Sequence, residues 1–181
     1  MTDLPFPHPP MTDWTRLIRD IHDFPRPGVL FKDIMPVLAD ADAFAAVIDA
    51  LAAPWRDVPI DAVMAIESRG FLFGAPLARA LGTGLVPLRK PGKLPGPVLE
   101  ARYALEYGED VLQVQTGAVA RGARVLLVDD VLATGGTLLA ARELALRLQA
   151  RVVGASVLME LAALGGRARW DGTPLRAALV V

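Results

Sequence analysis

The sequence predicts a doubly wound α/β fold with a mainly parallel sheet. Three apolar runs of strand length, residues 62–67, 124–130 and 152–161, are separated by stretches whose apolar residues have helical spacing. Strands that are apolar along their whole length are typical of parallel sheets covered on both faces. We therefore expect helices on both faces of one sheet, an inserted flexible antiparallel hairpin, and an N-terminal hood segment.

The amino-terminal part is predicted to contain two helices and a loop. Apolar residues at helical spacing predict the first helix over residues 12–22. Three prolines or glycines then predict a turn-rich loop over residues 23–34. Helical spacing returns over residues 42–53, and Pro54 is expected to end that second helix.

The remaining elements are expected to alternate between strands and helices. After the strand at 62–67 come a helix ending near Gly82, a strand at 85–89, a hairpin at 98–114 that turns at Gly108, the strand at 124–130, a helix at 136–150, the strand at 152–161 and an edge strand at 175–181. The hairpin has few residues of core type and follows two prolines, so we expect it to move.

Length and composition indicate one globular domain over residues 12–181, preceded by a disordered Pro-rich tail over residues 1–11. Met11 is an alternative start to Met1. A net charge of −1 argues against a nucleic-acid or membrane-surface partner. The chain has no cysteine, no apolar run of membrane-spanning length and no signal-peptide pattern, so we expect a cytoplasmic protein.

The segment VLLVDDVLATGGT, residues 125–137, predicts a site for a phosphorylated sugar. Its apolar strand ends in Asp129 and Asp130, at the edge where ligands bind in open α/β sheets. The two carboxylates are expected on opposite faces of the strand, accepting hydrogen bonds from sugar hydroxyls or helping to hold Mg²⁺. The small residues after them can close backbone N–H groups on a phosphate at a helix N-terminus. These residues are Ala133, Thr134, Gly135, Gly136 and Thr137.

Two other phosphate-binding motifs are absent from the sequence. It has no Walker A loop and no GxGxxG pattern after a strand.

A local basic set stands out in this nearly neutral chain. It consists of Arg69, Arg89, Lys90 and Lys93. Arg69 and Arg89 are at the carboxyl ends of two predicted strands, and guanidinium and ammonium groups suit phosphate oxygens. We expect the set to bind phosphate groups, with Glu67 orienting the adjacent turn.

Together these segments resemble the type I phosphoribosyltransferases. VLLVDDVLATGGT is similar to the phosphoribosyl pyrophosphate motif of that family. FPRPGVLFKDI, ESRGFLFGAPLA, RKPGKLPGP and LEYG resemble its adenine branch in the same order. The resemblance covers roughly residues 18–161. It implies transfer of a 5-phosphoribosyl group from phosphoribosyl pyrophosphate to adenine, giving AMP and pyrophosphate in purine salvage, with Mg²⁺ as cofactor and a homodimer as the assembly.

The resemblance also implies roles for individual residues. Catalytic roles fall on Glu106, Arg69, Asp129 and Asp130, with Glu106 assisting proton transfer on the base. Pyrophosphate would be bound by Arg69, Gly70, Arg89, Lys90 and Lys93. Tyr103 and Tyr107 would belong to a lid formed by the hairpin. A non-proline cis peptide at Ser68–Arg69 is left open.

The base pocket implied by the resemblance combines residues from two places in the sequence. They are Val29, Leu30, Phe31, Lys32 and Leu161. The family often has arginine where this chain has Lys32, so direct contact between Lys32 and the base stays open.

Three alternatives are weighed against adenine transfer. Enzymes that act on hypoxanthine or guanine typically have an acidic residue where this chain has Ala133. Uracil enzymes have proline where this chain has Asp130. A transcription regulator built on the same fold would be expected to carry a basic DNA-binding segment, and this sequence has none.

Overall fold

The computed structural model describes residues 13–104, 109–170 and 172–181. These residues form two compact units, one ending at Asp49 and the other over Ala50–Val181. The predicted tail lies outside the described residues, and the single domain over 12–181 stays a prediction. In the part of the chain that is described, no helix is both long and apolar enough to cross a bilayer.

The first unit contains a small antiparallel sheet followed by helices. The 3₁₀ helix η1 (Trp14–Leu17) leads into β1 (Arg19–His22), which pairs with β2 (Leu30–Asp33). Next come α1 (Met35–Ala39) and α2 (Ala41–Ala52). The helix predicted over residues 42–53 is thus confirmed to within one residue at each end.

Two predictions for the first unit are wrong. Residues 12–22 do not form one helix, because the chain leaves the helical turn after Leu17 and enters β1; residues 23–34 are not only a loop, because they include β2. The ladder sets Ile21 opposite Phe31, and Arg19 pairs with Asp33. Backbone hydrogen bonds to a partner about ten residues away outweigh a local helical pattern here.

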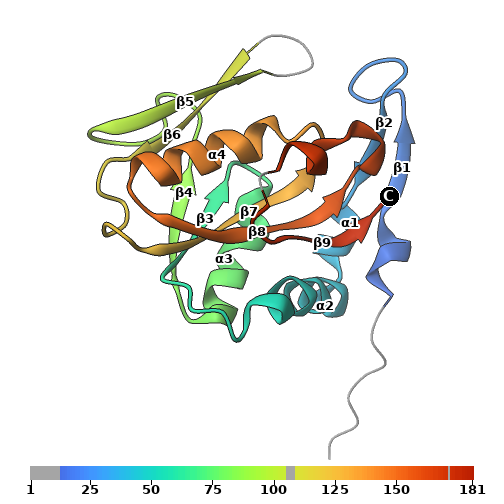
Figure 1. The fold of residues 1–181 in the computed structure, drawn as a ribbon. Coiled ribbons are helices and arrows are strands. Elements are labelled where there is room, and N and C mark those ends of the chain that lie inside the picture. Colours follow the sequence, from blue (N-terminus) through green and yellow to red (C-terminus); the bar gives the residue numbers. More distant parts are fainter. Residues whose placement is uncertain (1–12, 105–108, 171) are drawn as a thin grey trace, which may run out of the picture. The chain divides into compact units, whose positions relative to one another are not determined.

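The second unit is built on a five-stranded parallel sheet (Figure 1). Its order is β4 (Gly84–Leu88), β3 (Ala62–Ile66), β7 (Arg124–Leu132), β8 (Arg151–Glu160) and β9 (Leu175–Val180), and every neighbouring pair is parallel. The 3₁₀ helix η2 (Ala53–Trp55) precedes it, and η3 (Ala162–Leu164) and η4 (Gly166–Arg169) connect β8 to β9. The predicted parallel sheet and the edge position of the last strand are confirmed.

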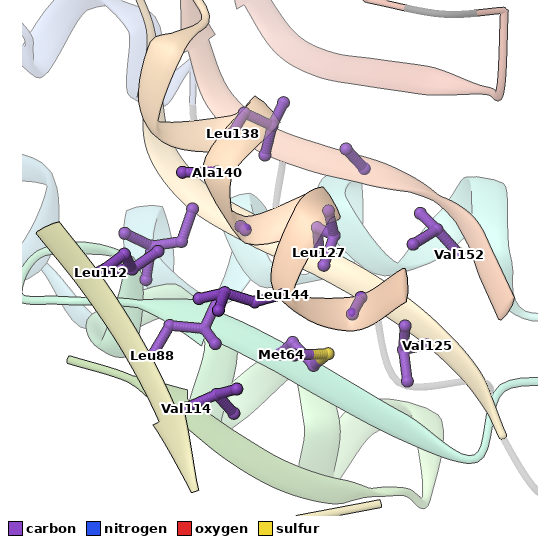
Figure 2. Packing of buried hydrophobic residues seen from close by; sticks show 14 of the residues in the cluster. Met64, Leu88, Leu112, Val114, Val125, Leu127, Leu138, Ala140, Leu144 and Val152 are labelled. Carbon is purple, nitrogen blue, oxygen red and sulfur yellow. The ribbon is translucent and has the colours of Figure 1, made fainter. Parts of the chain in front are cut away.

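Helices cover both faces of this sheet. Met64 of β3 and Leu127 of β7 share one buried cluster with Leu144 of α4 (Gly136–Arg147), as Figure 2 shows. On the opposite face α3 (Gly70–Leu81) packs so tightly that a Cβ on Gly74 would lie 2.4 Å from that of Ala65. Successive strand residues point to opposite faces, so the two helices lie on opposite sides.

The inserted hairpin is formed by β5 (Val98–Ala104) and β6 (Glu109–Gln115), which pair antiparallel as predicted. The expectation that it holds few core residues is wrong. Ala101, Leu112 and Val114 are at most 2% exposed and belong to the same cluster as Leu144. Figure 2 shows Leu112, Val114 and Leu144 in this cluster. Leu99 and Tyr103 are partly buried against the same cluster. These residues alternate along β5 and β6, so they lie on one face of the hairpin. The predicted turn at Gly108 lies outside the described residues.

Candidate active site

The carboxyl end of β7 and the start of α4 form the predicted phosphate turn. β7 runs two residues beyond the predicted end, to Leu132, and α4 begins at Gly136. Gly135 is the N-cap with φ 82°, a conformation that glycine adopts without steric cost. A hollow of about 50 Å³ is lined by residues 131–138. The turn therefore combines free helix N–H groups with a small concave surface.

Asp129 and Asp130 lie closer together than predicted. Asp129 Oδ1 accepts a hydrogen bond of 2.8 Å from the backbone N–H of Asp130, and the carboxylates of the two residues interact. Asp129 Oδ1 would also lie 3.0 Å from a Cβ on Gly70. The two carboxylates, expected on opposite faces of the strand, thus both lie near the turn that enters α3.

Arg69 and Asp130 join the two halves of the site. Arg69 Nε lies 2.7 Å from Asp130 Oδ2, although the two residues come from different elements. Burial and the neighbouring charge of Asp130 raise the pKa of Asp129 well above its ordinary value. The edge of the sheet thus holds one ion-paired acid beside one acid whose pKa is raised.

Glu67 organises most of the predicted basic set. Its Oε2 accepts hydrogen bonds from Arg89 Nε at 2.9 Å and from the backbone N–H of Lys90 at 2.7 Å. Its Oε1 lies 2.5 Å from Lys93 Nζ, and the Glu67 side chain is only 4% exposed. Burial alone would raise the pKa of Glu67, but the donors from Lys93, Lys90 and Arg89 outweigh it, and the pKa is lowered. The predicted orienting role of Glu67 therefore has a geometric basis.

The turn next to Glu67 contains a cis peptide, but not where it was considered. The cis bond joins Glu67 to Ser68, and Ser68–Arg69 is not cis. Arg89 also lies over the ring of Phe71, with its guanidinium carbon 5.5 Å from the ring centroid.

The hairpin reaches both the basic set and the phosphate turn. Lys90 Nζ lies 2.8 Å from Asp110 Oδ2, which also accepts a 3.3 Å hydrogen bond from the Tyr103 hydroxyl. The bond to Asp110 raises the pKa of Lys90. Tyr103 makes a further hydrogen bond with the side chain of Thr137. Sequence reasoning missed Asp110, since a single acid in an alternating strand has no distinguishing signal.

The predicted base residues are divided between the two units. Leu30, Phe31 and Lys32 are in β2, directly after Val29, whereas Leu161 follows β8. Lys32 Nζ lies 2.7 Å from Asp20 Oδ1. A shared base pocket for these residues stays a prediction, as does contact between Lys32 and a base.

Phe24 and Phe31 make an edge-to-face pair within the first unit, with ring centroids 5.0 Å apart. Leu30 is 44% exposed. Apolar and aromatic surface of this kind suits the stacking of a flat base.

Glu106 and Tyr107 lie outside the described residues, so their roles stay predictions. Among the residues described, no group of three or more histidine, cysteine, aspartate or glutamate side chains could hold a metal ion.

A segment that sequence reasoning did not consider lies against the phosphate turn. Arg169 Nη1 donates a hydrogen bond of 2.9 Å to the carbonyl oxygen of Thr134. A Cβ on Gly166 would lie 2.2 Å from the carbonyl oxygen of Ala133. The adjacent glycines 165 and 166 were the only signal of a special turn in this stretch.

Comparison with known proteins agrees with this geometry. The model of the phosphoribosyl transferase domain family matches residues 32–178. A curated relative from Xanthomonas campestris, named adenine phosphoribosyltransferase, is 59% identical over 169 residues, which are 93% of this chain and 91% of the relative.

Solved structures agree as well. The adenine phosphoribosyltransferase of Thermoanaerobacter pseudethanolicus is 46% identical with a TM-score of 0.91, over 95% of this chain and all of that one. The Giardia lamblia enzyme, solved with 9-deazaadenine, is 41% identical with a TM-score of 0.90, over 96% of this chain and 99% of its own.

Proposed function

The chain belongs to the adenine phosphoribosyltransferase family, and from this premise we propose how its residues perform the family's reaction. The reaction transfers the 5-phosphoribosyl group of phosphoribosyl pyrophosphate to adenine, giving AMP and pyrophosphate. The observation that supports our assignment of roles is the pair of buried acids at the end of β7, directly before the Gly135 turn.

The 5-phosphate binds at the turn formed by Ala133, Thr134, Gly135, Gly136 and Thr137. The free N–H groups at the start of α4 and the two threonine hydroxyls are its donors. Asp129 and Asp130 accept hydrogen bonds from the ribose hydroxyls. This division is supported by charge: a phosphate is attracted by the helix N-terminus, and only the uncharged sugar tolerates two adjacent acids.

The pyrophosphate group lies against Arg89, Lys90 and Lys93, with Arg69 and the backbone of Gly70 beside it. When the C1′–O bond breaks, pyrophosphate leaves with the electron pair, and these cations offset its growing negative charge. Glu67 is a positioning residue, since its carboxylate already holds Arg89 and Lys93 at 2.9 and 2.5 Å. Preset positions avoid rearrangement of charges during the reaction.

Adenine attacks C1′ through N9 and forms the new C–N bond as pyrophosphate departs. The attacking ring must lose a proton, and we assign its acceptance to Glu106. Val29, Leu30 and Phe31 form the proposed stacking slot, and Leu161 is proposed as a further residue for the base. Lys32 is proposed to support the base site through its pairing with Asp20 rather than by direct contact with the base.

Mg²⁺ is proposed as the cofactor, brought in by the substrate. Among the residues described, no three acids or histidines are grouped to hold a metal ion, and one of the two adjacent aspartates is paired to Arg69. These observations support a metal bound mainly by substrate oxygens and water. Bound there, the ion would neutralise charge on the leaving pyrophosphate. Asp129 and Asp130 are the residues that would reach it.

The hairpin is proposed to close over bound substrates through Tyr103 and Tyr107. The support is the contact of Tyr103 with both Asp110 and Thr137. Arg102 is exposed on β5, so trypsin can report on closure. Cleavage at Arg102 should slow when phosphoribosyl pyrophosphate and Mg²⁺ are added; equal rates with and without ligand would contradict the lid.

A homodimer is also proposed, since the resemblance implies one. Leu72 on α3 and Leu85 on β4 are 43% and 41% exposed, which is compatible with apolar contacts to a second copy. Light scattering after size exclusion should give twice the chain mass, and a mass of 19.3 kDa would contradict the dimer.

The cytoplasmic location stays a prediction, to be checked by fractionation of the source cells.

The decisive experiment is a product assay on the purified chain with Mg²⁺, phosphoribosyl pyrophosphate and one base at a time. Adenine should give AMP and pyrophosphate in equal amounts. Hypoxanthine, guanine and uracil should give almost no nucleotide. A faster reaction with any of these three bases than with adenine would refute the assignment, and omission of phosphoribosyl pyrophosphate is the blank.

A further inference from the structure

The turn proposed to bind the 5-phosphate is held from behind by the connection between β8 and β9. The backbone N–H of Leu161 donates a 2.9 Å hydrogen bond to the carbonyl of Leu132, the last residue of β7. Eight residues later, Arg169 Nη1 donates one of the same length to the carbonyl of Thr134. These two bonds fix the backbone just before and within the turn.

Between those two bonds, Gly166 lies directly on the turn. A Cβ on Gly166 would stand 2.2 Å from the carbonyl oxygen of Ala133 and 2.9 Å from the amide nitrogen of Gly135. In the other direction, a Cβ on Gly135 would stand 3.0 Å from the carbonyl oxygen of Gly166. The two backbones therefore touch, and neither position has room for a larger side chain.

The connection is itself anchored to the sheet. Arg167 Nε donates to both carboxylate oxygens of Glu160 at 2.9 Å, and Arg167 Nη1 donates to the carbonyl of Leu175 at 3.1 Å. Glu160 is only 5% exposed, and its hydrogen bond raises the pKa of Arg167. A forked pair with one buried carboxylate fixes both partners in one geometry. Gly166 and Arg169, on either side of Arg167, are thus presented by a rigid support.

Arg169 has a specific effect on the donors of the turn. In a trans peptide the C=O and the N–H point in opposite directions across one plane. The carbonyl of Thr134 and the N–H of Gly135 share such a plane, so holding the carbonyl toward Arg169 also sets the direction of that N–H.

We infer that Arg169 and Gly166 are positioning residues for the 5-phosphate, acting through the backbone of Thr134 and Gly135. This inference rests on the proposed function, which assigns the phosphate to the turn. Arg169 does not need to touch the substrate, and pyrophosphate, which is assigned to Arg89, Lys90 and Lys93, does not depend on it.

The test compares two ligands by calorimetry, ribose 5-phosphate and pyrophosphate with Mg²⁺. Arg169→Ala should weaken ribose 5-phosphate about fivefold, as expected for loss of one hydrogen bond, and leave the Kd of pyrophosphate unchanged. Arg169→Lys, which retains a donor, should recover most of the affinity. The KM for phosphoribosyl pyrophosphate should rise with the Kd of ribose 5-phosphate, while the KM for adenine stays the same.

Gly166→Ala is the second variant, and it should weaken ribose 5-phosphate by about tenfold or more, because its Cβ must displace the carbonyl of Ala133. Matched controls are Arg121→Ala, an exposed arginine, and Gly84→Ala, where a Cβ would meet nothing within 4 Å. Both controls should bind like the wild type.

Three results would overturn the inference. Unchanged binding of ribose 5-phosphate by Arg169→Ala would show that the contact with Thr134 has no effect on the donors. An equal loss for both ligands would indicate general damage rather than positioning. A wild-type chain that binds pyrophosphate but not ribose 5-phosphate would instead refute the proposed phosphate turn, and the inference with it.

Discussion

The Nε atom of Arg69 lies 2.7 Å from the Oδ2 atom of Asp130, joining the turn that enters α3 to the end of β7. The pairing offsets the charge of one of two adjacent buried acids. Asp129, the other, has a raised pKa, because it is buried and lies beside the negative charge of Asp130. Two neighbouring aspartates thus have different electrostatic environments within one site.

Neutralising either acid should remove most of the activity while the fold survives. Asp129→Asn and Asp130→Asn are each expected to lower kcat on the order of 100-fold, because each removes a carboxylate acceptor for the ribose, and Asp130→Asn also removes the partner of Arg69. Steady-state kinetics with circular dichroism would measure this, with the exposed Asp57→Asn as control. Wild-type turnover in both variants would refute the roles assigned to Asp129 and Asp130.

The same substitution at Asp129 should not cost stability at neutral pH. The pKa of Asp129 is higher in the folded chain than its ordinary value of 3.8, so folding favours the protonated carboxyl group. Ionisation of Asp129 therefore lowers the stability of the fold, increasingly as the pH rises from 3.8 through the folded pKa. Asparagine has no such penalty. Asp129→Asn should therefore melt at the same or a higher temperature than the wild type at pH 8, by a larger margin than at pH 5. A margin that grows toward acid pH would contradict the raised pKa.

Loss of the charge on Glu67 should weaken binding of the pyrophosphate end. Glu67→Gln removes the negative charge that Arg89 and Lys93 share, so both side chains gain alternative positions. The KM for phosphoribosyl pyrophosphate should rise about tenfold and the KM for adenine should not change. Glu143→Gln, an exposed acid paired with Arg147 on α4, is the matched control. A change confined to adenine would show that Glu67 acts elsewhere.

An acid at position 133 should depress adenine use without creating an enzyme for hypoxanthine. The carboxylate of Ala133→Asp would place a negative charge in the turn proposed for the phosphate, where it repels the ligand. Recognition of an oxopurine needs other donors as well, so hypoxanthine should remain a poor substrate. Kinetics with both bases would decide, and unchanged adenine kinetics would show that position 133 does not face the site.

The hairpin should contribute to folding stability, contrary to the sequence-based expectation that it has few core residues. Leu112 is 1% exposed within the main cluster, so Leu112→Ala should lower the free energy of unfolding by about 2–5 kcal/mol. Urea unfolding would measure it, with Leu146→Ala, which is 47% exposed, as the comparison. Equal losses in the two variants would mean that the hairpin adds little to the core.

Much of the fold was predictable, because its signals are local. Apolar runs long enough for buried strands predicted β3, β7 and β8, and Gly82 and Gly136 marked one end of α3 and of α4. The first unit was not predicted correctly. Whether residues 19–22 form a strand or a helix depends on their pairing with β2. That partner strand is too far along the sequence for a local pattern to reveal it.

The sequence by itself determined the parallel sheet, the acid pair at the end of β7 and the small-residue turn after it, because each follows from residue order along one strand and its successor. Only the tertiary structure decided the partners of those residues. Glu67 with Lys93, Lys90 with Asp110, and Arg169 with Thr134 are 20 to 35 residues apart, and chain folding alone sets which charges meet. Long-range pairing of this kind has no periodicity to detect, since it depends on where strands end in space.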